Sequence, residues 1–126
     1  MNRLLEQNGL AYADSQEAIK DLICGLIDES HHEFFVERRR NYRHSLAILL
    51  SVAPIENGQL GSEFPAVTHD ISSRGISFLY DSPVDCKYLF VRFPEYNRRQ
   101  ALVVEVLRQT KIRPFTMIAG MFRPTF

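Results

Sequence analysis

The chain has 126 residues and carries 15 Lys and Arg against 15 Asp and Glu, so its formal charge is zero. This length suits one domain with a real core, and the 45% hydrophobic and 24% charged residues exclude wholesale disorder. No apolar run is long enough to cross a bilayer, and residues 1–6 do not begin a signal-peptide core, so we expect a cytoplasmic protein without membrane insertion.

The neutral total hides an asymmetry along the chain. Residues 1–37 hold two basic and eight acidic side chains, a net charge of −6, whereas residues 38–126 have a net charge of +6. The sign changes between Glu37 and Arg38. A basic body of this size favours an anionic partner.

An amphipathic helix is expected first. Asp14 and Glu17 have the spacing of a capping box, which predicts a helix that starts near Ser15 and runs to about residue 30. Its apolar positions recur at helical spacing, at Ile19, Leu22, Ile23, Leu26 and Ile27. This stripe must pack on the rest of the chain or on a second copy, so a homodimer through the helix is an open alternative.

Strand patterns follow after Arg43. Six strands are predicted over residues 45–53, 64–71, 76–80, 88–93, 100–108 and 115–122. Pro54 is expected to end the first strand, and Asn57-Gly58 marks a turn. Short strands with frequent turns and no β-α-β alternation predict a mainly β fold, a small antiparallel barrel or sandwich.

Cysteine and histidine give little sign of special chemistry. Cys24 and Cys86 form no recognisable motif, and free thiols are expected. The four histidines lack zinc-ligand spacing, so we expect neither a metal nor a cofactor. No nucleophile lies at motif spacing from a base, which speaks against an enzyme.

Residues 38–43, between the predicted helix and the first strand, contain four arginines in six positions. Guanidinium groups bind phosphate in a bidentate manner, stack on rings and match the O6 and N7 acceptors of guanine. Alone, the segment is equally well explained as a solvated basic linker.

A second polar segment, residues 70–75, reads Asp-Ile-Ser-Ser-Arg-Gly between two predicted strands. Asp and Ser start turns through bonds from side chain to backbone, and Gly permits positive φ or a close backbone approach. A carboxylate here could also accept hydrogen bonds from guanine. Alone, the segment is best explained as a hairpin turn.

Together the two segments resemble the signature of the PilZ domain family, RRxxxR followed by DxSxxG. The resemblance implies a six-stranded antiparallel β-barrel over residues 36–126, with residues 1–35 as a helical N-terminal extension, and Gly120-Met121-Phe122 is similar to the family's last strand. It further implies a bacterial receptor for the second messenger cyclic di-GMP, with a role in motility or biofilm regulation. The implied ligand-binding residues are Arg38, Arg39, Arg43, Asp70, Ser72 and Gly75.

The resemblance also assigns roles within that site. Arg39 and Arg43 would hold phosphates and guanine, and Arg38, directly before the RxxxR pattern, implies an intercalated pair of ligand molecules. Arg40 and Arg74 are auxiliary candidates. We expect the arginine segment to become ordered over the ligand, reorient residues 1–37 and so relay the signal to a downstream protein.

Two other functions fit parts of the same pattern. A small barrel with a basic run, Arg98-Arg99 and surface aromatics could bind single-stranded nucleic acid, although the acidic helix would repel a polyanion. A PilZ-like protein-interaction module that binds no nucleotide is the second alternative, although such modules usually lack the arginines.

Overall fold

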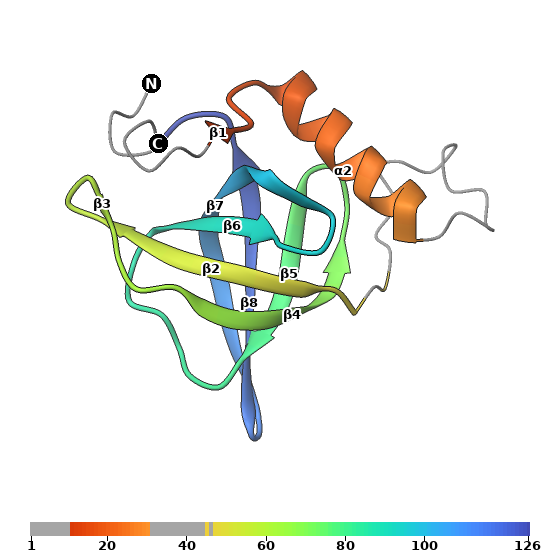
Figure 1. Ribbon diagram of the computed structural model, residues 1–126. Helices are drawn as coiled ribbons and strands as arrows, with labels where there is room; N and C mark the ends of the chain where they lie inside the picture. Colours follow the sequence, from red (N-terminus) through yellow and green to blue (C-terminus); the bar gives the residue numbers. More distant parts are fainter. Residues whose placement is uncertain (1–10, 31–44, 46) are drawn as a thin grey trace.

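The computed structural model describes residues 11–30, 45 and 47–126, with Ala11, residues 28–30 and residues 97–99 described by their backbone only. The chain forms one helix and several strands in this part (Figure 1). In chain order the elements are β1 (Ala11–Tyr12), α2 (Gln16–Ser30), β2 (Leu49–Glu56), β3 (Gln59–Leu60), β4 (Phe64–Ile71), β5 (Gly75–Tyr80), β6 (Tyr88–Phe93), β7 (Asn97–Ile112) and β8 (Phe115–Arg123).

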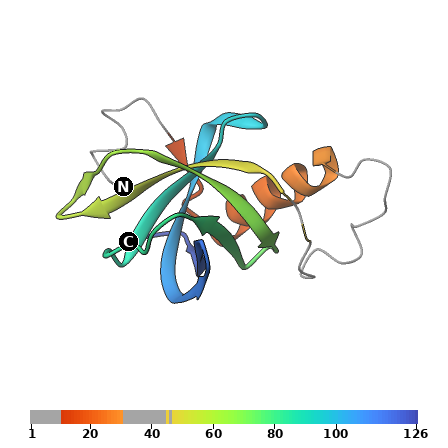
Figure 2. The same cartoon turned by 90° about the horizontal axis from the view of Figure 1, so that it is seen from below.

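Six strands close into an antiparallel barrel. They follow the order β7-β6-β2-β4-β5-β8, and β7 also pairs with β8, which closes the ring. The view from below shows the barrel strands crossing one another, with α2 beside them (Figure 2). The predicted mainly β fold, a six-stranded antiparallel barrel preceded by an amphipathic helix, is confirmed.

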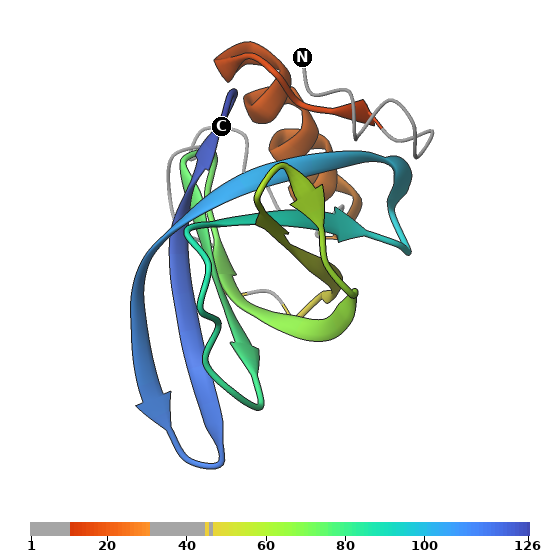
Figure 3. The same ribbon diagram turned by 90° about the vertical axis from the view of Figure 1, so that its left-hand side faces the viewer.

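The helix α2 lies across one end of the barrel (Figures 1 and 3). Its predicted apolar stripe is at most 9% exposed and shares one core cluster with inward-facing barrel residues such as Leu50, Phe78 and Phe93. Packing an amphipathic helix on a barrel end removes the apolar surface of both from water. The stripe is therefore occupied by the barrel, which favours packing over the alternative of a dimer seam.

The start of α2 corrects the predicted capping box. The hydroxyl oxygen of Ser15, not the carboxylate of Asp14, accepts a hydrogen bond from the backbone N–H of Ala18, at 3.0 Å. The helix then begins at Gln16. Asp and Ser are almost equally good caps, so two adjacent candidates leave the choice to the way the chain enters the helix.

Pro54 does not end the first strand, contrary to the prediction. β2 continues to Glu56, and Pro54 lies opposite Leu89 of β6. The Pro54 carbonyl accepts from the N–H of Gly61 at 2.8 Å, so the ring nitrogen faces that same side, away from β6. The missing N–H therefore costs no bond of the β2–β6 ladder. Residues 45, 47 and 48, predicted as strand, lie before β2 instead.

The turn predicted at Asn57-Gly58 is confirmed. Both residues have positive φ, 53° and 73°, which are typical of the two-residue type I′ hairpin that connects β2 to β3.

Two further differences concern β1 and β7. β1 was not predicted, and its two residues pair in parallel with Gln100 and Ala101 of β7. β7 continues past the predicted end at Arg108 to Ile112, because residues 109–112 contain no strand breaker. The resulting β7–β8 hairpin projects beyond the rest of the barrel (Figures 1 and 3).

Candidate functional site

The arginine segment lies outside the described residues. The placements of Arg38, Arg39 and Arg43, and of the auxiliary candidate Arg40, therefore stay predictions. The second segment, residues 70–75, is described in full and connects β4 to β5.

Ser72 organises the turn between these strands. Its hydroxyl oxygen accepts from the backbone N–H groups of Arg74 at 3.2 Å and Gly75 at 3.3 Å, and its own N–H donates to the Gly75 carbonyl at 2.9 Å. The side chain is 5% exposed. A hydroxyl here satisfies N–H groups that the tight turn leaves without a ladder partner. Ser72 thus has a structural role of its own, independent of any ligand.

Asp70 joins the two strands beside this turn. Its Oδ1 accepts a hydrogen bond from the Ser77 hydroxyl at 2.9 Å, and Asp70 and Ser77 are directly paired. His69 lies in a register shift of β4, with its Nδ1 at 3.5 Å from Asp70 Oδ2. The bulge places the Asp70 carboxylate on the outer face of the barrel, because Ile76 and Phe78 on either side of Ser77 face the core.

Gly75 allows β5 to approach β8 closely, and Gly120 allows β8 to approach β7 closely. A Cβ on Gly75 would lie against the carbonyl oxygen of Gly120, and a Cβ on Gly120 would lie against the carbonyl oxygen of Glu105. The backbone N–H of Phe122 also donates to the Arg74 carbonyl, at 2.9 Å. The turn is therefore held against the last strand.

The strand registers place four side chains in one row across the outer face. Asp70 pairs with Ser77, Ser77 with Ala119, and Ala119 with Arg108. The middle of this row is low because Ser77 and Ala119 are small. The row therefore runs from a carboxylate on β4 to a guanidinium on β7.

A hollow of about 600 Å³ opens on this part of the surface. The floor of the hollow is formed by Gly75, Ala119 and Gly120, whose side chains are no larger than a methyl group. Ser72, in the turn between β4 and β5, also lines the hollow. Its larger lining side chains are Arg74, Leu107, Arg108 and Met121. Two arginines beside a flat floor suit an anionic ligand with a planar ring.

Of the predicted site residues in the described part of the chain, Ser72 and Gly75 line the hollow and Asp70 lies in the adjoining row. Sequence reasoning placed Arg74 there only as an auxiliary residue and missed Arg108. Arg108 follows a register shift in β7 that places it opposite Ala119. The signal in the sequence that could have identified Arg108 is its position as a cation at the end of a mostly apolar strand pattern.

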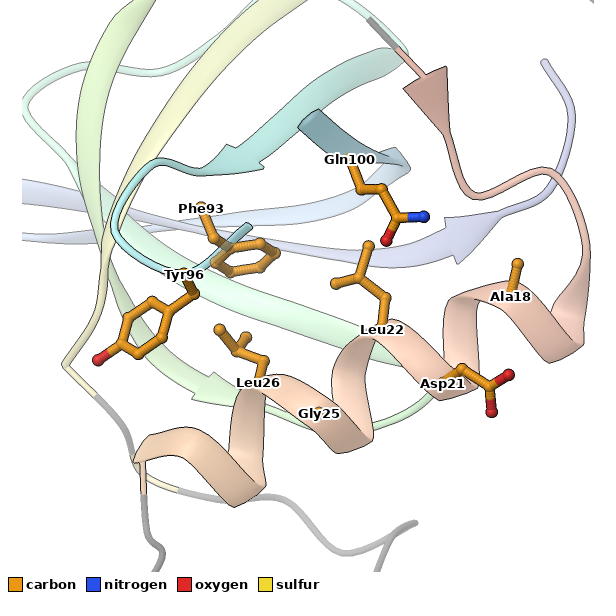
Figure 4. Close-up of a pocket in the computed structure, with 8 residues that line it drawn as sticks. All are labelled: Ala18, Asp21, Leu22, Gly25, Leu26, Phe93, Tyr96 and Gln100. Atoms are coloured by element: carbon orange, nitrogen blue, oxygen red, sulfur yellow. The ribbon is translucent and has the colours of Figure 1, made fainter. Parts of the chain in front are cut away.

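A second hollow, of about 370 Å³, lies between α2 and the turn from β6 to β7 (Figure 4). Figure 4 shows Leu22 and Leu26 of the helix pointing toward Phe93, with Asp21 at the outer side. The charged residue in its lining is the carboxylate of Asp21. This carboxylate would repel an anion, so the second hollow is less suited to an anionic ligand than the first.

The described residues show no group of three or more His, Cys, Asp or Glu that could hold a metal. Cys24 and Cys86 form no disulfide bond in the structure. No helix within the described part of the chain has the length and apolar character that a bilayer crossing requires.

No protein-family model matches the chain, and no curated protein does. Among solved structures, the chain is similar to the Bacillus subtilis inhibitor of motility MotI/DgrA, with 17% identity and a TM-score of 0.47. The match covers 68% of this chain and 42% of that one, so the chain spans less than half the length of that protein.

Proposed function

We propose that the chain is a PilZ-like receptor for cyclic di-GMP. The observation that carries the proposal is the hollow at the DxSxxG turn, where Arg74 and Arg108 flank a floor of small residues. It adds two cations to the RRxxxR segment, which the sequence places about thirty residues before this turn.

The chemistry of the ligand matches these groups. Cyclic di-GMP carries two phosphates and two guanine rings, and guanidinium groups bind phosphates, stack on rings and donate to guanine acceptors. A floor built by Gly75, Ala119 and Gly120 lets a planar base approach the backbone closely. The Asp70 carboxylate on the same face can accept from the N–H groups of guanine.

The arginine segment supplies the remaining contacts in this proposal. Arg39 and Arg43 bind phosphate and guanine, and Arg38 selects an intercalated pair of ligand molecules. The site then needs no metal or cofactor, and the chain acts as a receptor and not as an enzyme. Binding orders the segment and reorients residues 1–37, which passes the signal to a downstream protein.

Calorimetric titration with cyclic di-GMP tests the proposal. We expect saturable heat with two ligand molecules per chain, loss of binding in Arg43→Ala, and at least about tenfold weaker binding in Arg108→Ala. Lys20→Ala removes an exposed cation on α2 that does not line the hollow, and it should bind like the native chain.

Each outcome has a distinct meaning. If the folded native chain gives no heat of binding, the proposed receptor function is wrong. The alternative of a protein-interaction module that binds no nucleotide is then favoured. One ligand molecule per chain overturns the intercalated pair alone. Normal binding by Arg108→Ala separates the hollow from the ligand site. Tighter, strongly salt-dependent binding of a short oligonucleotide identifies a nucleic-acid binder instead.

Hydrogen exchange of residues 36–44 tests the ordering step separately. We expect slower exchange in this segment at saturating cyclic di-GMP than without it. Unchanged protection at saturation would remove the ordering step while leaving the receptor function intact.

A further inference from the structure

The β7–β8 hairpin extends beyond the barrel as a preformed arm (Figures 1 and 3). Its strands stay paired from Arg108↔Ala119 to Ile112↔Phe115 at the end. The side-chain amide of Gln109 fixes its base, since Oε1 accepts from the N–H of Val84 and Nε2 donates to the Val84 carbonyl, both at 2.9 Å. A surface on such an arm loses little conformational entropy when it binds.

The end of the arm is apolar. Ile112 and Phe115 are each 44% exposed, and because they are directly paired their side chains lie on one face. Pro114, between them in the turn, is exposed as well. Neither Ile112 nor Phe115 belongs to a core cluster of the barrel.

The arm is also basic. Residues 106–126 contain no Asp or Glu, and Arg108, Lys111 and Arg113 are exposed. A hollow of about 430 Å³ at the tip is lined by Lys111, Arg113 and Phe115, together with Asp81 and Pro83 from the segment after β5. With two cations and one carboxylate around this hollow, the tip has a net positive charge.

We propose that the tip of this arm docks on the surface of an anionic lipid bilayer. Ile112 and Phe115 enter the interfacial layer, and Lys111 and Arg113 lie at the lipid phosphates. The hairpin projects from the barrel (Figure 1), and a bilayer accepts projecting apolar side chains without a complementary pocket. This contact is peripheral and does not rest on the nucleotide proposal, because its groups lie beyond the hollow at Arg108.

Co-sedimentation of the full chain with vesicles tests the proposal, without nucleotide. We expect binding to vesicles of equal parts phosphatidylglycerol and phosphatidylcholine, little binding to pure phosphatidylcholine, and loss of binding at about 0.5 M salt. Lys111→Gln and Arg113→Gln should each weaken binding about fivefold. Ile112→Ser with Phe115→Ser should weaken it at least about tenfold.

Matched control variants distinguish an effect of the tip from the general effect of removing an exposed apolar or basic side chain. Leu49→Ser with Val67→Ser removes two apolar side chains that are each 42% exposed on the barrel wall, and Lys20→Gln removes an exposed cation on α2. Both should bind vesicles like the native chain. The proposal is overturned if the folded native chain does not bind anionic vesicles, or if the tip variants bind as well as these controls. If the native chain does not bind anionic vesicles, an acidic protein surface becomes the candidate partner of the arm.

Discussion

At the scale of single residues, Gly75 and Gly25 are a matched pair with opposite expectations. A methyl group on Gly75 meets the Gly120 carbonyl oxygen, whereas nothing lies within 4 Å of a Cβ on Gly25. We expect Gly75→Ala to destabilise the fold by about 1–3 kcal/mol, because β5 must separate from β8. Gly25→Ala, in the interior of α2, should stabilise it by about 0.5–1 kcal/mol.

Urea denaturation of the two variants checks this pair. A Gly75→Ala midpoint equal to that of the native chain would contradict the close approach of the two strands. The comparison also bears on the DxSxxG pattern, because it measures how far its glycine serves the barrel in the absence of any ligand.

At the scale of elements, an ion pair ties the barrel wall together. Arg92 of β6 donates to both carboxylate oxygens of Glu63 at 2.7 Å, and the Ser51 hydroxyl of β2 donates to Glu63 Oε1 at 2.6 Å. The hydrogen bond from Ser51, followed by Arg92, lowers the pKa of Glu63 below its ordinary value of 4.5, against the opposing effect of burial. The ionised carboxylate is therefore the form that the folded state stabilises.

The stability that Glu63 contributes should depend on pH. A lowered folded-state pKa gives a contribution that is present above the unfolded pKa and is lost as the pH falls through the folded one. Glu63 is 49% exposed, so solvent screens the pair, and we expect Glu63→Gln to cost less than about 1 kcal/mol at pH 7. The difference between the urea midpoints of the two proteins should begin to shrink as the pH falls below about 4.5 and should vanish only below the lowered pKa of the folded state. A difference that stays constant into acid would contradict this assignment.

At the scale of the whole molecule, α2 and the barrel share one core and should unfold together. Ile23 is fully buried in that core, and Ile23→Ala should cost about 2–5 kcal/mol. Helical circular dichroism and tyrosine fluorescence should shift to the same lower midpoint. Lys20→Ala, at an exposed position of the same helix, should change neither signal appreciably. Separate transitions would show that the helix melts independently of the barrel.

The sequence predicted what depends on local patterns. The apolar stripe of α2, the turn at Asn57-Gly58 and the turn after β4 follow from residue spacing or turn chemistry within a few positions. The barrel class followed from the number and length of the strands together with the two PilZ-like segments.

What the sequence left open depends on register and on distant partners. Arg108 joins the hollow only because a register shift places it opposite Ala119. Pro54 is tolerated in β2 because its ring nitrogen faces the side of Gly61, which no local pattern reveals. β1 is too short to show a period, and its parallel pairing with β7 is a tertiary contact.

The β7–β8 hairpin belongs to both proposed sites, and this couples them. Arg108 borders the hollow, and Ile112 at the tip follows four residues later, roughly 13 Å along the strand. That separation is close to the Debye length of about 8–10 Å at physiological ionic strength. A bound dianion at Arg108 would therefore slightly reduce the attraction of the arm for an anionic bilayer. By linkage, the bilayer would weaken nucleotide binding by the same factor, so the second messenger would favour release from the membrane.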